Sequence, residues 1–94
     1  MDLHYIYILT NKNHTVLYIG RSKQLKIRLK QHENNSSKTF TGKYNVNKLV
    51  YFETTKYVNN SINRERQIKK WNREWKENLI KDMNPDWKDL SDLL

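Results

Sequence analysis

Two short runs of apolar and aromatic residues near the start of the chain are separated by a polar segment, and this pattern predicts a β-hairpin. Residues 5–9 (Tyr-Ile-Tyr-Ile-Leu) and 16–19 (Val-Leu-Tyr-Ile) are rich in strand formers. The polar segment 11–14 (Asn-Lys-Asn-His) between them suits a turn. Gly20 follows directly, and we expect it to end the second strand and let the backbone bend into the next segment.

The hairpin also predicts which side chains share a face of the sheet. Successive side chains point to opposite faces of a strand, so Tyr5 and Tyr7 lie on one face while Ile6 and Ile8 lie on the other. Pairing across the turn brings Tyr7 near Tyr18. We therefore expect two phenols side by side at the edge of a small sheet.

Leucines spaced four residues apart predict a helix after the hairpin. Ser22 is the expected N-cap, and the helix runs to about His32 with Leu25 and Leu29 as its apolar stripe. Arg28 and His32 are also four residues apart, on the same side as the leucines. An arginine that faces the sheet needs an anionic partner, supplied by the protein or by a substrate.

A polar loop over residues 34–45 leads to a third run of strand formers. Residues 46–53 alternate less cleanly than the hairpin does, but residues 49–52 (Leu-Val-Tyr-Phe) favour a strand that packs beside it. The connection from the hairpin passes through a helix. The pattern therefore indicates an α/β fold, with a small, mostly antiparallel three-stranded sheet flanked by about three helices.

A second helix is expected from about residue 58 to residue 70, with Ile62 and Ile68 on its buried side. Glu65 lies three residues from each isoleucine, which places it roughly 60° from either one around the helix axis. Its carboxylate cannot point straight into solvent. Such a group costs free energy unless it is paired or binds a metal.

The last third of the chain predicts a third helix followed by a tail. Its apolar residues have helical spacing: Trp75, Leu79 and Ile80. Pro85 ends the helix, because the residue before a proline disfavours α conformation. We expect Trp87 and Leu90 to fold the tail back over the core.

Composition narrows the class of protein. The 94 residues predict one domain, spanning residues 1–94, with a small core to which 11 aromatic residues contribute much of the volume. The absence of cysteine excludes disulfides and thiolate metal sites. No apolar run is long enough to span a bilayer and no signal-peptide pattern opens the chain, so we expect a soluble, cytoplasmic protein.

A net charge of +8 predicts salt-dependent attraction to polyanions. The bases cluster in residues 21–30 and 64–81, and solvated helix faces are the alternative reading of both clusters. Neither segment has a broad apolar face for a membrane surface. Nucleic acid is therefore the favoured partner, through these candidate contacts: Arg21, Lys23, Lys26, Lys43, Lys69, Lys70 and Arg73.

Five sequence elements, in order, resemble the GIY-YIG nuclease domain. They are Tyr5-Ile6-Tyr7, Tyr18-Ile19-Gly20, Arg28 with His32, Glu65 within the segment 63–71, and the segment 84–90 that begins Asn-Pro-Asp-Trp. Aromatic strands alone would be weak evidence, but five ordered elements covering residues 5 to 90 are strong evidence. The first motif departs from the family in one place, where Tyr5 replaces the usual glycine and narrows the space beside the site.

The resemblance implies phosphodiester hydrolysis in DNA. Tyr7 would act as the general base on water or orient it, and Tyr18 would help to position the water or the phosphate. Arg28 would clamp a phosphate oxygen, because its planar fork suits an anion. A phenol with its ordinary pKa of about 10 is a poor base at neutral pH, so positive charge nearby must stabilise the phenolate.

The resemblance also implies a metal site and two supporting residues. Glu65 would bind a single divalent cation, Mg²⁺ or Mn²⁺, which can be held by one carboxylate and several waters. His32 would orient or deprotonate a tyrosine, and Asn84 would fix the geometry of the site. Each also has a purely structural reading: Glu65 can pair with Arg28 or Lys69, and Asn84 can cap a helix C-terminus.

Three functions stay open from the sequence. The first is a stand-alone, metal-dependent endonuclease, acting as a monomer or a weak homodimer, with or without a targeting partner protein. The second is a nucleic-acid-binding module that kept this fold without catalysis, and the third is a protein-interaction domain with a basic surface. Members of the resembled family act in repair, restriction, recombination and intron homing. The loop from Asn34 to Tyr44 and the tail after Asn84 are the candidate specificity elements.

Overall fold

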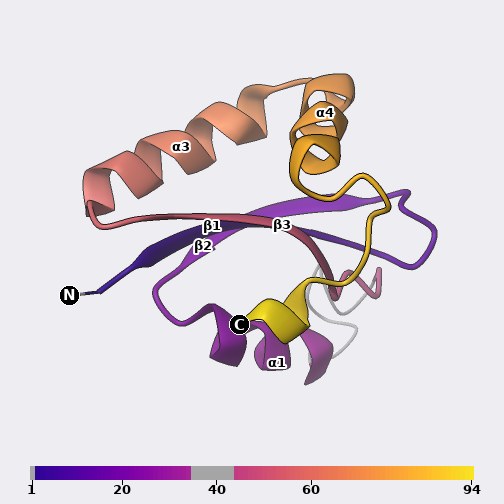
Figure 1. Ribbon diagram of the computed structural model, residues 1–94, viewed down its shortest axis with the longest axis horizontal. Helices are drawn as coiled ribbons and strands as arrows, with labels where there is room; N and C mark the ends of the chain where they lie inside the picture. The colour runs from indigo at the N-terminus through magenta and orange to yellow at the C-terminus, as the bar shows by residue number, and fades with distance from the viewer. Residues whose placement is uncertain (1, 35–43) are drawn as a thin grey trace.

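The structure, a computed structural model, describes residues 2–34 and 44–94. Three strands, three helices and a short 3₁₀ helix make up the described chain (Figure 1). In chain order they are β1 (His4–Thr10), β2 (Leu17–Ser22), α1 (Leu25–Asn34), β3 (Lys48–Thr55), α3 (Val58–Lys70), α4 (Arg73–Met83) and η1 (Ser91–Leu93).

The strands form one antiparallel sheet in the order β2-β1-β3. In the hairpin register Tyr7 pairs with Gly20 and Leu9 pairs with Tyr18. The β1–β3 register shifts between Ile8 and Leu9, where β3 contains an extra residue. The predicted fold class, with the third strand beside the hairpin, is confirmed.

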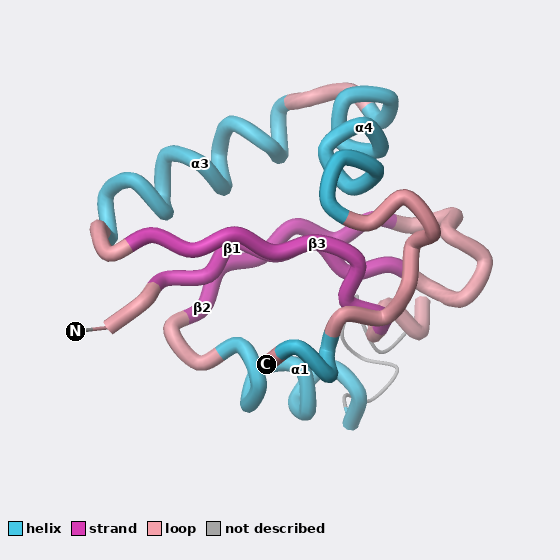
Figure 2. The backbone as a smooth tube through the Cα atoms, viewed as in Figure 1, coloured by secondary structure: helices cyan, strands magenta, loops and turns pink. Residues whose placement is uncertain are grey.

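The sheet separates two helical layers, as Figures 1 and 2 show. Helices α3 and α4 cover one face, and α1 lies with the C-terminal residues against the other. Two buried clusters follow from the alternation along β1. The cluster under α3 and α4 contains Ile6, Ile8, Ile19, Val50, Tyr51, Ile68 and Ile80, and the cluster over α1 contains Tyr7, Leu9, Leu25, Val46 and Leu49.

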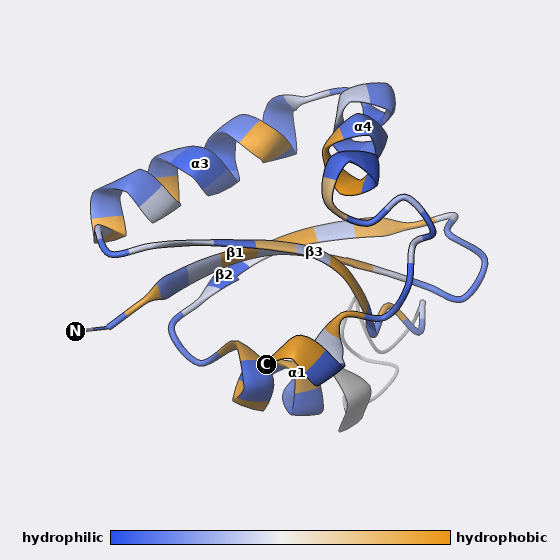
Figure 3. Cartoon of the chain, viewed as in Figure 1, coloured by the Kyte–Doolittle hydropathy of each residue, from blue (hydrophilic) through white to orange (hydrophobic). Residues whose placement is uncertain are grey.

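The covering helices have narrow apolar stripes. Figure 3 shows α3 hydrophilic over most of its length, and the buried residues of this helix are Ser61 and Ile68. A helix of this kind is held by packing on one side while its charged side faces solvent. None of the described helices is long and apolar enough to cross a membrane.

The start of α1 differs from the prediction. Strand β2 continues through Gly20 to Ser22, so this glycine does not end the strand as expected. The helix begins at Leu25, and Ser22 is therefore too early to be its N-cap. The Ser22 hydroxyl instead accepts a hydrogen bond from the Gln24 amide (3.0 Å), and the Gln24 carbonyl accepts the Arg28 amide (3.0 Å). Ser22 therefore stabilises the bend that leads into the helix, and it does not cap the helix itself.

The tail folds back over both layers, as predicted. The Leu90 amide donates to the carbonyl of Leu49 on β3 (2.8 Å). Trp87 packs against the cluster under α3 and α4, while Leu90 packs against the cluster over α1. Trp87 also stacks on the His14 ring of the hairpin turn, with ring centroids 4.7 Å apart.

Candidate active site

The Tyr7 ring lies directly on the backbone of Gly20, its partner across the hairpin. A Cβ added at Gly20 would overlap Cζ and Oη of Tyr7 and would stand 2.8 Å from Cε2. Only glycine allows the ring to approach so closely. Because β2 is an edge strand, the phenol reaches across the hairpin toward the free edge of the sheet.

The second tyrosine lies beside the first, as the sequence predicted. The ring centroids of Tyr7 and Tyr18 are 6.4 Å apart, with 38° between the ring planes. Their exposure differs, since Tyr7 is 1% exposed whereas Tyr18 is half-buried. Tyr18 is therefore the phenol that a substrate or a water molecule can reach more easily.

Arg28 links the two phenols from α1. Burial raises the pKa of Tyr7 above its ordinary value, and a hydrogen bond with Arg28 opposes that rise. The pKa of Arg28 is raised in turn, mainly by its hydrogen bond with Tyr7 and also by Tyr18. Arg28 remains an exposed residue. Its guanidinium can therefore hold both tyrosines and still meet an anion from solvent.

Glu65 reaches the same part of β2 from the opposite face of the sheet. One carboxylate oxygen lies 3.8 Å from Nε of Arg21, the residue after Gly20, and the other lies 3.3 Å from Nζ of Lys69. The side chain is 20% exposed. Its charge contributes to the raised pKa of Tyr7. The tyrosine pair and the carboxylate thus meet around the free edge of β2.

The donors at this edge fit one hard cation with an incomplete protein shell. Among the described residues, no three His, Cys, Asp or Glu side chains gather into a metal cage. Mg²⁺ needs no such cage, because it keeps several waters and takes one or two carboxylates plus substrate phosphates. The partly exposed oxygens of Glu65 match that chemistry, provided that Arg21 and Lys69 give way.

The other two expected site residues are placed differently. His32 belongs to α1, one turn beyond Arg28, and its side chain is not among those described. Asn84 is buried at the end of α4 and faces β3, the opposite edge strand. Its Nδ2 donates to the carbonyls of Val50 (3.1 Å) and Lys88 (2.7 Å), and its Oδ1 accepts the Lys88 amide (3.0 Å).

Asn84 therefore closes the C-terminus of α4 onto the sheet and the tail. Its own amide also donates to the Ile80 carbonyl (2.7 Å), which completes the last turn. The structure does not bring it to the edge where Tyr7, Arg28 and Glu65 lie. Its contacts agree with the helix-capping reading of this residue.

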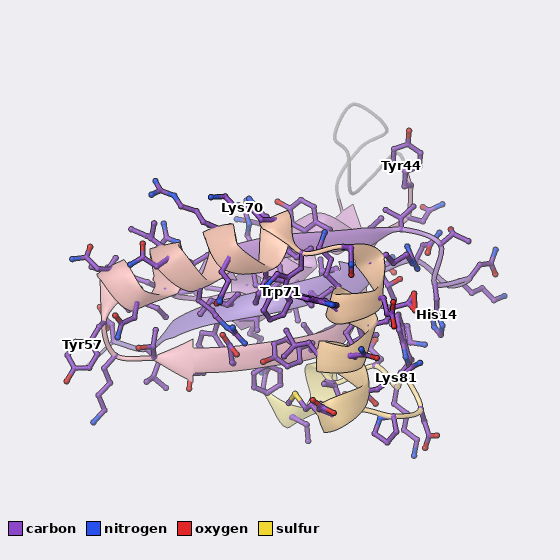
Figure 4. All side chains as sticks on the ribbon, turned by 90° about the horizontal axis from the view of Figure 1, so that it is seen from above. His14, Tyr44, Tyr57, Lys70, Trp71 and Lys81 are labelled. Atoms are coloured by element: carbon purple, nitrogen blue, oxygen red, sulfur yellow. The ribbon has the colours of Figure 1, made fainter. Side chains whose placement is uncertain are left out.

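The candidate DNA contacts fall into two groups. Arg21, Lys23 and Lys26 are exposed residues at the junction of β2 and α1. Lys70 is exposed at the end of α3 (Figure 4), while Lys69 is engaged with Glu65. Lys43 lies outside the described residues.

Arg73 is held by the hairpin rather than presented to a substrate. Its guanidinium donates to the backbone carbonyls of His14 and Thr15 (3.0 Å for Thr15), and its Nε pairs with Glu77 (2.8 Å). The contact joins α4 to the β1–β2 turn. Arg73 thus positions the helix, and its charge is already matched by protein oxygens.

A network on the other side of α3 was not anticipated from the sequence. Arg64 Nε donates to Glu53 of β3 (2.6 Å), and the Tyr51 hydroxyl donates to the second oxygen of the same carboxylate (2.5 Å). Arg64 and Glu65 are neighbours in sequence, so the helix is tied to β3 on one flank and to β2 on the other. Glu53, the single acidic residue of β3, was the signal in the sequence, but only the tertiary structure decides that it pairs with Arg64, eleven residues away.

Comparison with known proteins agrees with this geometry. Residues 3–78 match the model of the GIY-YIG catalytic domain, and the chain belongs to that family. The matched stretch contains both tyrosines, Arg28 and Glu65, and it ends before Asn84.

Among named relatives, the chain is similar to the UPF0213 proteins. One from Staphylococcus saprophyticus is 35% identical over 85% of this chain and 96% of its own length. One from Clostridium perfringens is 37% identical over 83% of each chain. The solution structure of a UPF0213 protein from Bacillus halodurans matches 97% of this chain and 96% of its own with a TM-score of 0.59, and at 22% identity it shows the shared fold alone.

Proposed function

We propose that this protein is a metal-dependent endonuclease that hydrolyses phosphodiester bonds in DNA. The observation that supports this most is the meeting of two phenols, an exposed guanidinium and a partly exposed carboxylate at one edge of the sheet. Family membership supports a nuclease-like fold. The net charge of +8 supports a polyanionic substrate.

The two tyrosines differ in solvent exposure, and we therefore assign them different roles. Tyr18 is the one that can touch water, so we assign it the contact with the attacking water. Tyr7 is buried with a raised pKa, so it stays a neutral hydrogen-bonding group that holds Arg28 in place. Arg28, which hydrogen-bonds both phenols, would face a non-bridging phosphate oxygen of the substrate.

Glu65 would hold the cation. When bound, a divalent ion supplies positive charge to the phosphate and to the leaving oxygen. Arg21 and Lys69, which meet the carboxylate in this structure, would then be available to contact neighbouring phosphates. In the free protein these two residues neutralise the Glu65 carboxylate, and in the complex they would contact the substrate.

The decisive experiment is metal-dependent cleavage with a matched pair of variants. Glu65→Ala should lose nicking of a DNA panel (single-stranded, duplex and branched) while keeping most DNA binding, because a cation ligand is removed and not a basic surface. Glu77→Ala is the control, since Glu77 forms the equivalent pair with a base four residues away on α4. Full cleavage by folded Glu65→Ala protein would refute the metal role.

A catalytically silent DNA-binding module is the second candidate. The observation in its favour is that both oxygens of Glu65 face cations of the protein itself. In that case the wild-type protein shifts DNA in a gel, and no nicking occurs with Mg²⁺ or Mn²⁺ on any substrate of the panel.

A further inference from the structure

The three tryptophans differ in their surroundings, and one of them is free to bind a flat ligand. Trp71 packs against the buried cluster under α3 and α4, with the Arg64 guanidinium 5.2 Å from its ring centroid. Trp87 stacks on His14. Trp75 is 57% exposed. An exposed tryptophan offers a face on which a nucleobase can stack.

Trp75 lines a shallow, open pocket. Its ring meets that of Trp71 edge-on, with centroids 5.8 Å apart and 76° between the planes. Together with Asn78, Leu79 and Asp82 the two rings line a cavity of about 200 Å³ between the end of α3 and α4. Figure 4 shows Trp71 in this gap between the helices. The volume is below the range of about 300–1,000 Å³ typical of drug-sized ligands, and it suits a single ring system.

Two polar side chains line the pocket beside the rings, Asn78 and Asp82. The Asp82 carboxylate repels a phosphate. A neutral base with an amino group is favoured instead, since Asp82 accepts and Asn78 both donates and accepts hydrogen bonds.

We propose that this groove, lined by Trp71, Trp75, Asn78, Leu79 and Asp82, binds an unpaired base of a DNA strand stacked on Trp75. The inference rests on the proposed function for its choice of DNA. It deepens that function by making the substrate a strand with unpaired nucleotides. Asp82 favours cytosine, adenine and guanine, which carry exocyclic amino groups, over thymine, which has none.

Binding is measured without cleavage, in EDTA, by anisotropy of short labelled strands of oligo(dC), oligo(dT) and an abasic backbone. Trp75→Ala should weaken binding of oligo(dC) by about tenfold, within the range for loss of one stacked base. Binding of the abasic strand should be unchanged, and Trp75→Phe should restore most of the loss. Tyr57→Ala is the matched control, because Tyr57 is an even more exposed aromatic residue at the far end of α3 (Figure 4).

The pyrimidine pair tests the role of Asp82 at constant base size. The wild-type protein should prefer oligo(dC) to oligo(dT), and Asp82→Ala should remove the preference while tightening both complexes, because a negative charge is removed. The ratio of the two affinities cancels the charge effect. An unchanged ratio would overturn the assigned recognition.

Three other outcomes also overturn the proposal. They are equal losses in Trp75→Ala and Tyr57→Ala, a Trp75→Ala protein that binds like wild type, and a wild-type protein that binds none of the strands. Loss of self-association in Trp75→Ala, with DNA preferences intact, would identify the groove as an interface between copies. Base-dependent binding without metal-dependent cleavage would refute the nuclease activity and leave the pocket standing.

Discussion

At the scale of single residues, the site depends on how closely Tyr7 approaches Gly20. The ring occupies the space that any side chain at Gly20 would need. It is thereby directed toward the edge strand, where Tyr18 and Arg28 meet it. The glycine is a requirement of packing, and the strand continues through it.

Gly20→Ala should therefore disturb both stability and the site. We expect a loss of about 1–3 kcal/mol in the free energy of unfolding, as for overpacking elsewhere in protein cores. Urea unfolding measures it. The double variant Gly20→Ala, Tyr7→Leu lacks the clashing atoms Cζ and Oη. Its loss in the free energy of unfolding should be smaller than the sum of the losses in the two single variants. Strict additivity would mean that the ring does not lie on Gly20 in solution.

The pH dependence of cleavage separates the two tyrosines. The pKa of Tyr7 is raised above its ordinary value of about 10, so this phenol stays protonated from about pH 6 to about pH 9. Tyr7→Phe should then lower the rate by a similar factor at every pH in that window. If Tyr18 is the base, the wild-type rate rises with pH, and Tyr18→Phe should lower the rate by about 10²-fold and flatten the rise.

Tyr5→Phe is the control for both changes, because Tyr5 lies on the same strand and face and its ring meets Phe52 (centroids 6.2 Å apart). A flattened profile in Tyr7→Phe instead of Tyr18→Phe would return the base role to Tyr7.

At the scale of elements, α3 and α4 are fixed by polar contacts at specific points. Arg64 and Glu65 tie α3 to opposite edge strands. Arg73 ties the start of α4 to the hairpin turn, and Asn84 ties its end to β3 and the tail. Since the helices have few buried residues, these contacts set where each helix lies along the sheet.

Asn84→Ala should reveal a structural role. The change leaves the buried carbonyl of Val50 and backbone groups of Lys88 without their side-chain partner, at about 1–3 kcal/mol for a buried group. A loss of about 2 kcal/mol corresponds to a fall in Tm of roughly 10 °C for a domain of this size. Calorimetry measures it, with exposed Asn78→Ala on the same helix as the control.

The cleavage rate of folded Asn84→Ala protein at low temperature should stay near that of the wild type. A rate that falls with no loss of Tm would place Asn84 in the active site after all.

At the scale of the whole molecule, the basic side chains differ in how closely they are paired with oxygen atoms of the protein. Arg73 and Lys69 are matched by protein oxygens, whereas Lys23 and Lys26 are exposed at the junction of β2 and α1. Lys23 has only a 3.9 Å contact with Asp2, and both side chains of that pair are largely exposed. On the proposed function, we therefore expect the segment after β2 to contact phosphates of the substrate.

Neutralising Lys23 and Lys26 together should weaken DNA binding to a similar extent for all sequences. The slope of log affinity against log salt should fall by about 0.7–0.9 for each phosphate that the protein no longer neutralises. The control neutralises Lys12 and Lys88, which removes the same charge from the hairpin turn and the tail. Equal slopes for the two double variants would show that only net charge matters and that the substrate lies elsewhere.

Much of this molecule follows from local rules that act within a few residues. Two runs of strand formers, residues 5–9 and 16–19, set the hairpin and thereby the faces of its tyrosines, and helical spacing places Glu65 at the margin of the buried stripe of α3. The ordered motifs identify the family. Each of these depends on side-chain periodicity, which the chain carries before it folds.

The partners of individual side chains were decided only by the tertiary structure. The same helical periodicity allows Glu65 to meet Arg28 or Lys69, and the packing of α3 over β2 selects Lys69 and Arg21. The burial and ring contacts of Trp71, Trp75 and Trp87 likewise depend on how α3 and α4 cross. All three are large apolar residues, and the sequence alone does not distinguish the exposed one. Burial and pairing are properties of surfaces brought together from distant parts of the chain, and local sequence does not contain their relative placement.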